Sequence, residues 1–289
     1  MNGAAASSSL FKPAVVRLCR DPLAMAGLVV ISMVVLAALL APVLSPNDPN
    51  MAKLTEKLIP PSGKYPLGTD HLGRCILSRL IYGARVSLGT AAVVLAGILV
   101  VGLPVGSLAG YVGGKVDAVI MRLVDVLLAF PGLVLALAVS GMLGPGLGNV
   151  MVALGAVWWV EYARIIRGMV FAEREKEYVL AAMVGGTRTA KLLTRHVLPN
   201  VLSPVIVMAT LDMGKLVLYI SALSFLGLGA QPPAAEWGAM LNDGRQYMQV
   251  APMLMVWPGL AIMVVVLAFN LLGDGIRDAL DPRQLSRAE

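Results

Sequence analysis

Residues 172–200 read AEREKEYVLAAMVGGTRTAKLLTRHVLPN, a long charged segment between two apolar segments that can each cross a bilayer. Helix connections usually need only about 2–8 residues, so the excess length indicates two short helices that form a docking surface. Ala181 and Ala182 permit close helix approach, and Gly186 is expected to end the first helix. Pro199 is expected to mark the boundary before the next span. The alternative is a charged loop in which the AAxxxG pattern occurs by chance.

The composition is that of an integral membrane protein. Of the 289 residues, 58% are hydrophobic and only 14% are charged, and the mean hydropathy is +0.80. Soluble domains have roughly 45–50% apolar and about 25% charged residues. The net charge of +6 does not indicate nucleic-acid binding, because the basic residues lie in loops beside the apolar segments.

Six membrane-spanning helices are expected, and therefore an all-α fold. The apolar run 23–44 is long enough to cross ~30 Å of hydrocarbon and too long for the core of a signal peptide. Pro131 falls inside the third span and is expected to kink it. The other five spans are expected at about 86–109, 115–143, 150–166, 201–223 and 253–272.

These spans define the domain organisation. Both termini are assigned to the cytosol, because more basic residues then lie inside than outside. The expected parts are a cytosolic N-terminal segment (1–22), the first transmembrane helix (23–44), an external loop and surface helix (45–85), a five-helix core (86–273) with a cytosolic loop (172–200) and an external segment (224–252), and a cytosolic tail (274–289).

The surface helix is predicted from a possible cap. Asp70 is a plausible N-cap for a helix starting near His71, and an apolar stripe follows it. A metal or catalytic role for this Asp-His pair is less favoured, because no further histidine lies nearby. Cys19 and Cys75 should face opposite sides of the membrane and cannot pair.

Two charged pairs carry expectations within the spans. Arg122 is expected to pair with Asp125 on the third span. Asp212 and Lys215 lie three residues apart on one face of the fifth span. Ionisable groups at membrane depth usually face a cavity or each other, so these two are either a neutralised structural pair or a polar lining of a path.

Four stretches occur together in the chain: LGTDHLGRCILSRLIYGARVSLG at 67–89, the loop 181–200, LSFLGLGAQPPAAEWGAMLNDGRQY at 223–247 and WPGLAIMVVVLAFNLLGDGIRDALDP at 257–282. They resemble the permease subunits of ABC importers of the peptide/nickel branch, and within it the second, C-type permease. The resemblance implies the type I ABC importer permease fold. It implies that the chain forms half of a translocation path for nickel, in chelated form, or for di- or oligopeptides.

The resemblance also implies site residues. Segment 172–200 is similar to the coupling loop that seats in a cleft of the ATPase subunit, although Leu180 stands where many members carry a glutamate. Asp212 and the run NDGRQY (242–247) look more like nickel-importing members, although Lys215 stands where a histidine is expected. Implied coupling residues are Ala181, Ala182, Gly186, Arg195 and Leu198, and implied path residues are Asp212, Met213 and Lys215.

The chain is expected to be non-catalytic. It has no GxxxxGK[ST] run to cradle ATP phosphates, and neither a cofactor nor a metal is expected in it. The family implies a homologous second permease, two ATP-binding subunits that bind ATP and Mg²⁺, and an extracytoplasmic substrate-binding protein, all at the bacterial inner membrane. The main alternative is a secondary transporter driven by an ion gradient without ATPase partners.

Overall fold

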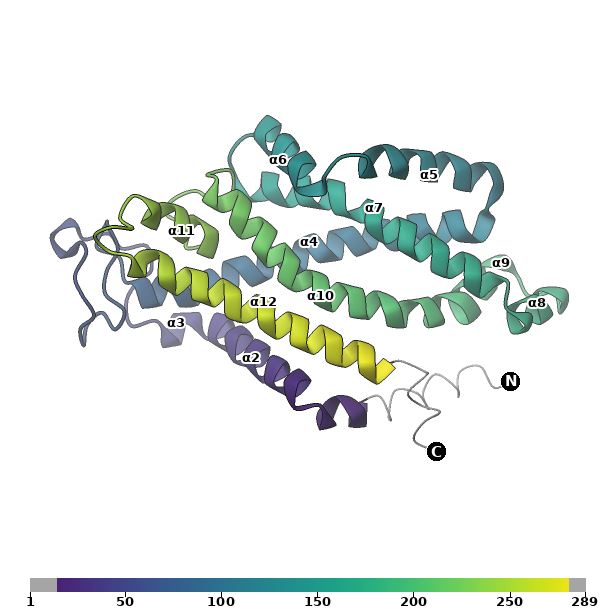
Figure 1. Ribbon diagram of the computed structural model, residues 1–289, viewed down its shortest axis with the longest axis horizontal. Coiled ribbons are helices and arrows are strands. Elements are labelled where there is room, and N and C mark those ends of the chain that lie inside the picture. The colour runs from purple at the N-terminus through teal and green to yellow at the C-terminus, as the bar shows by residue number, and fades with distance from the viewer. Residues whose placement is uncertain (1–14, 281–289) are drawn as a thin grey trace.

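The structure, a computed structural model, describes residues 15–280, and this part of the chain is helical apart from its loops. Figure 1 shows the long helices running roughly along one axis. The helices are α2 (Pro22–Leu39), α3 (Ala41–Leu44), η1 (Leu54–Glu56), α4 (Ile76–Val112), α5 (Gly114–Leu128), α6 (Gly132–Leu143), α7 (Leu147–Arg174), α8 (Glu177–Val184), α9 (Thr189–Leu192), the π-helical turn η2 (Leu193–Val197), α10 (Leu198–Phe225), α11 (Trp237–Arg245) and α12 (Met253–Leu280).

The number of apolar helices fits six spans. Within residues 15–280, five helices are long and apolar enough to cross a membrane, and the bent pair α5 and α6 makes a sixth candidate. The bend between α5 and α6 is 85°, so the kink expected at Pro131 is a complete break. Pro131 lies just before α6, where its missing N–H breaks the helical hydrogen-bond ladder.

The two ends of the molecule carry different elements (Figure 1). One end, called here the α11 end, holds α11 with residues 45–75 and 226–252. The opposite end, called the α8 end, holds residues 175–197. Between the ends, one large apolar cluster joins α4, α7, α10 and α12.

Helices α4 and α7 approach each other along glycines. A Cβ on Gly106 would lie 2.5 Å from the carbonyl oxygen of Ala163, and one on Gly110 would lie 2.5 Å from that of Arg167. Only glycine fits at these two positions, whereas Gly97 of the same helix has open space around it.

The second span begins differently from the prediction. No separate helix starts near His71. Instead α4 starts at Ile76, with Cys75 at its N-cap, and continues without a break to Val112. Asp70 is not a helix cap, because its carboxylate accepts the backbone N–H groups of Leu72 and Arg74 within the preceding loop.

Two further expectations need correction. Asp125 does not pair with Arg122; it pairs with Arg164 of α7, across the gap between two helices. Pro199 does not separate the loop from the next span, because α9, η2 and α10 follow one another directly and Pro199 lies in the first turn of α10. A proline is tolerated there because the first N–H groups of a helix have no helical partner.

The chain termini are described only in part. The predicted segments 1–22 and 274–289 extend beyond residues 15–280, and what was predicted for 1–14 and 281–289 lies outside the described residues. Cys19 is exposed and Cys75 is buried, and both are free thiols.

Candidate functional site

The segment between α7 and α10 projects from the α8 end (Figure 1). Its helix α8 is anchored by one apolar side chain, Val179, which is completely buried. On the rest of α8 the large apolar side chains are open to solvent, and Val184 is 89% exposed. The exposed large apolar side chains of α8 are Tyr178, Leu180, Met183 and Val184.

The predicted coupling residues occupy both sides of this projection. Ala181 is exposed on α8, and Ala182 is half-buried. Gly186 follows α8 with φ of +76°, a left-handed conformation that favours glycine, so the predicted helix end is confirmed. Arg195 and Leu198 lie apart from these residues, in the π-helical turn and at the first position of α10.

A polar network joins α8 to both neighbouring spans. Glu173 at the end of α7 is 7% exposed, and it accepts hydrogen bonds from Tyr178 and, at 2.8 Å, from the amide of Asn200. The Asn200 amide also donates to the Tyr178 hydroxyl at 2.7 Å, and Lys176 lies 2.6 Å from the second Glu173 oxygen. Partial burial and the Glu173 hydrogen bond raise the pKa of Tyr178 to about 12. The sequence did not identify this network, since its members lie in three different elements.

The charged pair of the fifth span is formed in the middle of α10. The Lys215 ammonium lies 2.8 Å from Oδ1 of Asp212, and the Tyr162 hydroxyl of α7 donates to Oδ2 at 2.8 Å. Exposure rises along this series: Tyr162 is 1% exposed, while the side chains of Asp212 and Lys215 are 15% and 59% exposed. Met213 does not join the pair, because its side chain packs against the apolar core.

Other groups from α7 surround the pair. Glu161 is exposed, and the charges of Asp212 and Lys215 both act on it. One helical turn away, the rings of Trp158 and Tyr219 lie 4.8 Å apart at 42°. Glu161 has no role among the predictions from sequence, although a carboxylate inside an apolar span is itself an indication of function.

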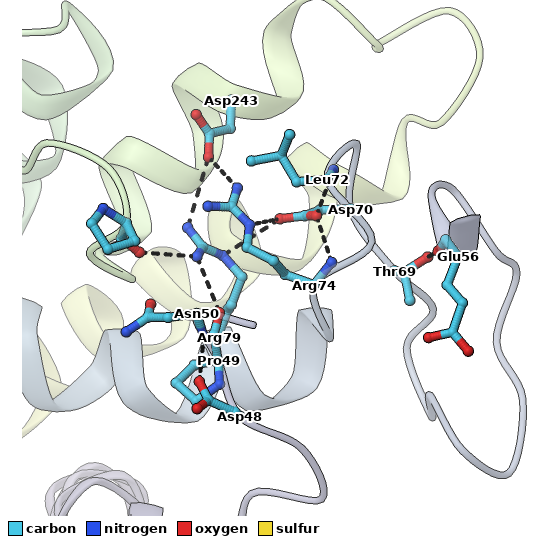
Figure 2. Close-up of polar contacts among 11 residues, drawn as sticks. Asp48, Pro49, Asn50, Glu56, Thr69, Asp70, Leu72, Arg74, Arg79 and Asp243 are labelled. Atoms are coloured by element: carbon cyan, nitrogen blue, oxygen red, sulfur yellow. Dashed lines mark hydrogen bonds and ion pairs between the residues drawn. The ribbon is translucent and has the colours of Figure 1, made fainter. Parts of the chain in front are cut away.

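A second charged group, called here the arginine cluster, lies at the α11 end and comprises Asp70, Arg74, Arg79 and Asp243 (Figure 2). Both guanidinium groups are 2% exposed. Arg74 contacts Asp70 at 2.6 Å and Asp243 at 2.9 Å, and Arg79 reaches the same two carboxylates at 3.6 and 3.7 Å. The two positive charges therefore face two negative charges in a buried site.

The arginine cluster also involves backbone groups. Arg79 donates to the carbonyl oxygens of Pro49 and Pro233, so one side chain of α4 joins two loops. His71 stacks on Tyr247 with ring centroids 5.3 Å apart. Within residues 15–280, no group of three or more His, Cys, Asp or Glu side chains is placed to hold a metal ion.

The same end has a buried carboxylate. Glu236 is 0% exposed and caps α11, accepting the N–H of Ala239 at 2.9 Å. Its other oxygen accepts the hydroxyls of Ser87 on α4 and Ser221 on α10, at 3.1 and 3.4 Å. Both ends of α11 are thus fixed to the long helices, Glu236 at the start and Asp243 near the finish.

Family models match most of the chain. Residues 102–286 match the binding-protein-dependent transport system inner membrane component, and residues 9–61 match the N-terminal transmembrane domain of oligopeptide transport permease C. Together the two matches include both the loop with α8 and the charged pair of α10.

Curated relatives of two kinds are similar to the chain. The dipeptide transport system permease protein DppC of Alkalihalophilus pseudofirmus is 42% identical, over 96% of this chain and 91% of the relative. The nickel transport system permease protein NikC of Escherichia coli is 43% identical, over 89% of this chain and 92% of the relative.

The fold resembles a solved transporter. A chain of the inward-facing MetNI methionine ABC transporter is similar with a TM-score of 0.56 and 22% identity, over 71% of this chain and 98% of that one. This likeness supports the type I importer permease fold expected from the sequence. The chain, a non-catalytic membrane component, belongs to the inner membrane components of binding-protein-dependent transport systems, as a C-type permease of the peptide/nickel branch.

Proposed function

We propose that this chain pairs with a homologous permease and forms half of the translocation path of an ATP-driven importer for nickel, in chelated form, or for di- or oligopeptides. A substrate-binding protein delivers the substrate at the α11 end, which is external. Two ATPase subunits, which bind ATP and Mg²⁺, act at the α8 end, which is cytosolic together with both termini. Relatives of both substrate kinds match the chain equally well, so both classes enter the test.

The exposed apolar side chains of α8 are the observation that carries the coupling proposal. Val184 is 89% exposed at the tip of a helix too short to insert into a membrane. Apolar side chains gathered on a projecting helix indicate a binding surface for a protein partner. Loop 172–200 then transmits ATPase movement, with Ala181, Ala182 and Gly186 in the docking helix, and Arg195 and Leu198 at the base of α10.

The path is proposed at the charged pair of α10. Asp212 and Lys215 lie at mid-span, and Lys215 is largely exposed on the isolated chain. A charged side chain at that depth is stable only toward a water-filled cavity or a partner, not toward lipid. Met213 is proposed to contribute from the same turn. Asp243 of the NDGRQY run belongs to the arginine cluster instead, so that run lies outside the proposed path.

Co-purification and uptake test the proposal together. We expect two ATPase subunits to elute with the chain when it is expressed with its neighbouring genes. In a deletion strain, the complete set should restore uptake of labelled nickel or a labelled dipeptide. Uptake should stop when the phosphate-binding lysine of the ATPase is changed to alanine. Uptake that persists in this variant and collapses with the ion gradient would identify the secondary transporter instead.

A further inference from the structure

Asp212 and Lys215 pair at mid-span on α10, and Glu161 on α7 lies within range of their charges. Glu161 and Asp212 carry two negative charges, and Lys215 carries one positive charge. Among residues 15–280, Lys215 is the partner of Asp212, while Glu161 forms no ion pair within 4 Å. The group therefore has a net charge of −1 at membrane depth, where an uncompensated charge is costly.

The packing behind these helices decides which way the group faces. A Cβ on Gly102 of α4 would lie 2.8 Å from Cβ of Tyr162, so α4 closes the inner side of α7 at this level. Gly214 of α10 similarly lies against Val266 of α12. The rising exposure from Tyr162 to Lys215 therefore leads away from α4 and α12, toward the face where a second permease would lie.

Aromatic rings and a broken helix lie beside the charges. The Trp158–Tyr219 pair is one helical turn from Tyr162 and Lys215, toward the α11 end. A Cβ on Gly132, directly after the break between α5 and α6, would lie 3.5 Å from the Trp158 ring. Irregular backbone at membrane depth is tolerated where protein covers it or where it lines a cavity. Aromatic faces next to carboxylates suit an organic cation.

We propose that Asp212, together with the Trp158–Tyr219 pair, forms a binding subsite for one protonated primary amino group of the transported molecule, with Glu161 as the second partner of Lys215. This inference rests on the proposed path and names the chemistry that it recognises. One ammonium group neutralises the net charge of −1. The N-terminal amino group of a peptide has this chemistry.

Lys215 is the internal equivalent of that amino group. Its ammonium makes with Oδ1 of Asp212 the contact that the substrate would make, while Tyr162 keeps Oδ2 in place. An arriving ammonium displaces Lys215, whose exposed side chain turns to Glu161. Two ion pairs, the substrate ammonium with Asp212 and Lys215 with Glu161, then replace the single pair of Asp212 with Lys215. The charges of these three side chains and the substrate ammonium then sum to zero. When Lys215 returns to Asp212, it expels the substrate.

A bare divalent metal ion fits these residues less well. Such an ion brings two positive charges to a site of net charge −1, and it needs several ligands. Within the described part of the chain, no three His, Cys, Asp or Glu side chains converge. The proposal therefore commits to an organic ammonium, and metal transport is an outcome that overturns it.

The test uses the complete transporter, with both permeases, the ATPase subunits and the binding protein, in proteoliposomes. Uptake per ATP hydrolysed is measured for labelled alanyl-alanine and for labelled nickel with histidine. The variants are Asp212→Asn, Asp212→Glu, Glu161→Gln, Lys215→Met and the double variant Asp212→Asn/Lys215→Met. Asp274→Asn, an exposed acid on α12, is the matched control. Incorporation and thermal stability are measured for each variant.

Dipeptide uptake should fall by about tenfold or more in Asp212→Asn, because a charge-assisted hydrogen bond is lost. Glu161→Gln should lower uptake less, and Lys215→Met should slow uptake while lowering the half-saturating dipeptide concentration. The double variant should stay as poor as Asp212→Asn. Asp212→Glu should recover part of the uptake, and Asp274→Asn should match the parent.

Several results overturn the inference. Recovery of normal uptake in the double variant would show that Asp212 and Lys215 only neutralise each other. In Asp212→Asn, loss of nickel uptake with normal dipeptide uptake would assign the site to a metal and leave the proposed path unchanged. Unchanged uptake of both labels in Asp212→Asn would remove the pair from the path, and entry of neither label into parent vesicles would overturn the substrate classes as well.

Discussion

The α11 end and the α8 end hold their short helices in opposite ways. At the α11 end, α11 is joined to the loop before α4 through the buried Arg74, to α4 through the buried Arg79, and to α4 and α10 through the fully buried Glu236. At the α8 end, α8 has one buried apolar anchor, Val179, and one polar network at its start. The first arrangement fixes α11 to the long helices, whereas the second leaves most of α8 accessible to a partner.

Burial explains the mechanical difference. Charges removed from water are stable only with all their partners in place, so the arginine cluster permits one geometry for α4, α11 and the 45–75 loop. The hydrogen bonds of Tyr178 and Asn200 are near solvent, where water replaces a lost partner at small cost. Movement that enters at α8 would therefore be transmitted to α7 and α10, while the α11 end moves as a unit with α4.

The largest expected effect is at the arginine cluster. Asp70→Asn removes one negative charge and leaves two buried guanidinium groups facing Asp243 alone. Leaving a buried charge without its partner costs about 3–5 kcal/mol, so we expect little protein in the membrane and a lower thermal midpoint in detergent. Asp48→Asn makes the same change at an exposed position of the same loop and should shift stability by less than about 0.5 kcal/mol. Equal stability of the two variants would contradict the rigid α11 end.

Sequence reasoning succeeded where the pattern was local. Apolar length gave the spans, Pro131 gave the break in the third span, and Gly186 gave the end of α8. It failed where partners are distant in the chain. Asp70 looked like a helix cap because Asp243, joined to it through Arg74, lies far along the sequence.

Pairings across helices were missed for the same reason. Arg122 is near Asp125 in sequence, yet Asp125 pairs with Arg164 and Asp117 pairs with Arg167 at 2.9 Å. Helical spacing identifies neighbours on one helix, but it contains no information about the helix packed beside it. At mid-span, the i,i+3 spacing of Asp212 and Lys215 predicted their shared face, while the contribution of Tyr162 required the fold.

The second effect concerns transport rather than stability. Gly186→Asp should leave the protein in the membrane, because open space surrounds this position, but it places a charge on the proposed docking surface. We expect import to be lost while the ATPase subunits still hydrolyse ATP. Gly186→Asn is the matched control, since asparagine tolerates the left-handed conformation and adds no charge. Normal import by Gly186→Asp would remove this surface from coupling, and equal losses in both variants would assign the effect to the backbone.

The smallest expected effect comes from removing one tyrosine hydroxyl at either end of the molecule. Tyr178→Phe removes a hydroxyl that donates to Glu173 and accepts from Asn200, and Tyr65→Phe removes one that donates to Glu56 in the 45–75 loop. Each variant keeps its ring, so the loss is about 0.5–1.5 kcal/mol of hydrogen bonding in both. Because Tyr178, unlike Tyr65, connects α8 with α7 and α10, import per ATP hydrolysed should fall several-fold in Tyr178→Phe and remain at the parent value in Tyr65→Phe. The ratio of import per ATP hydrolysed between the two variants separates the positioning of α8 from stability, because both variants lower stability by a similar amount. If the two variants import equally well, the Glu173 network holds α8 without transmitting its movement, and Val179 and the backbone alone connect the ATPase to the spans.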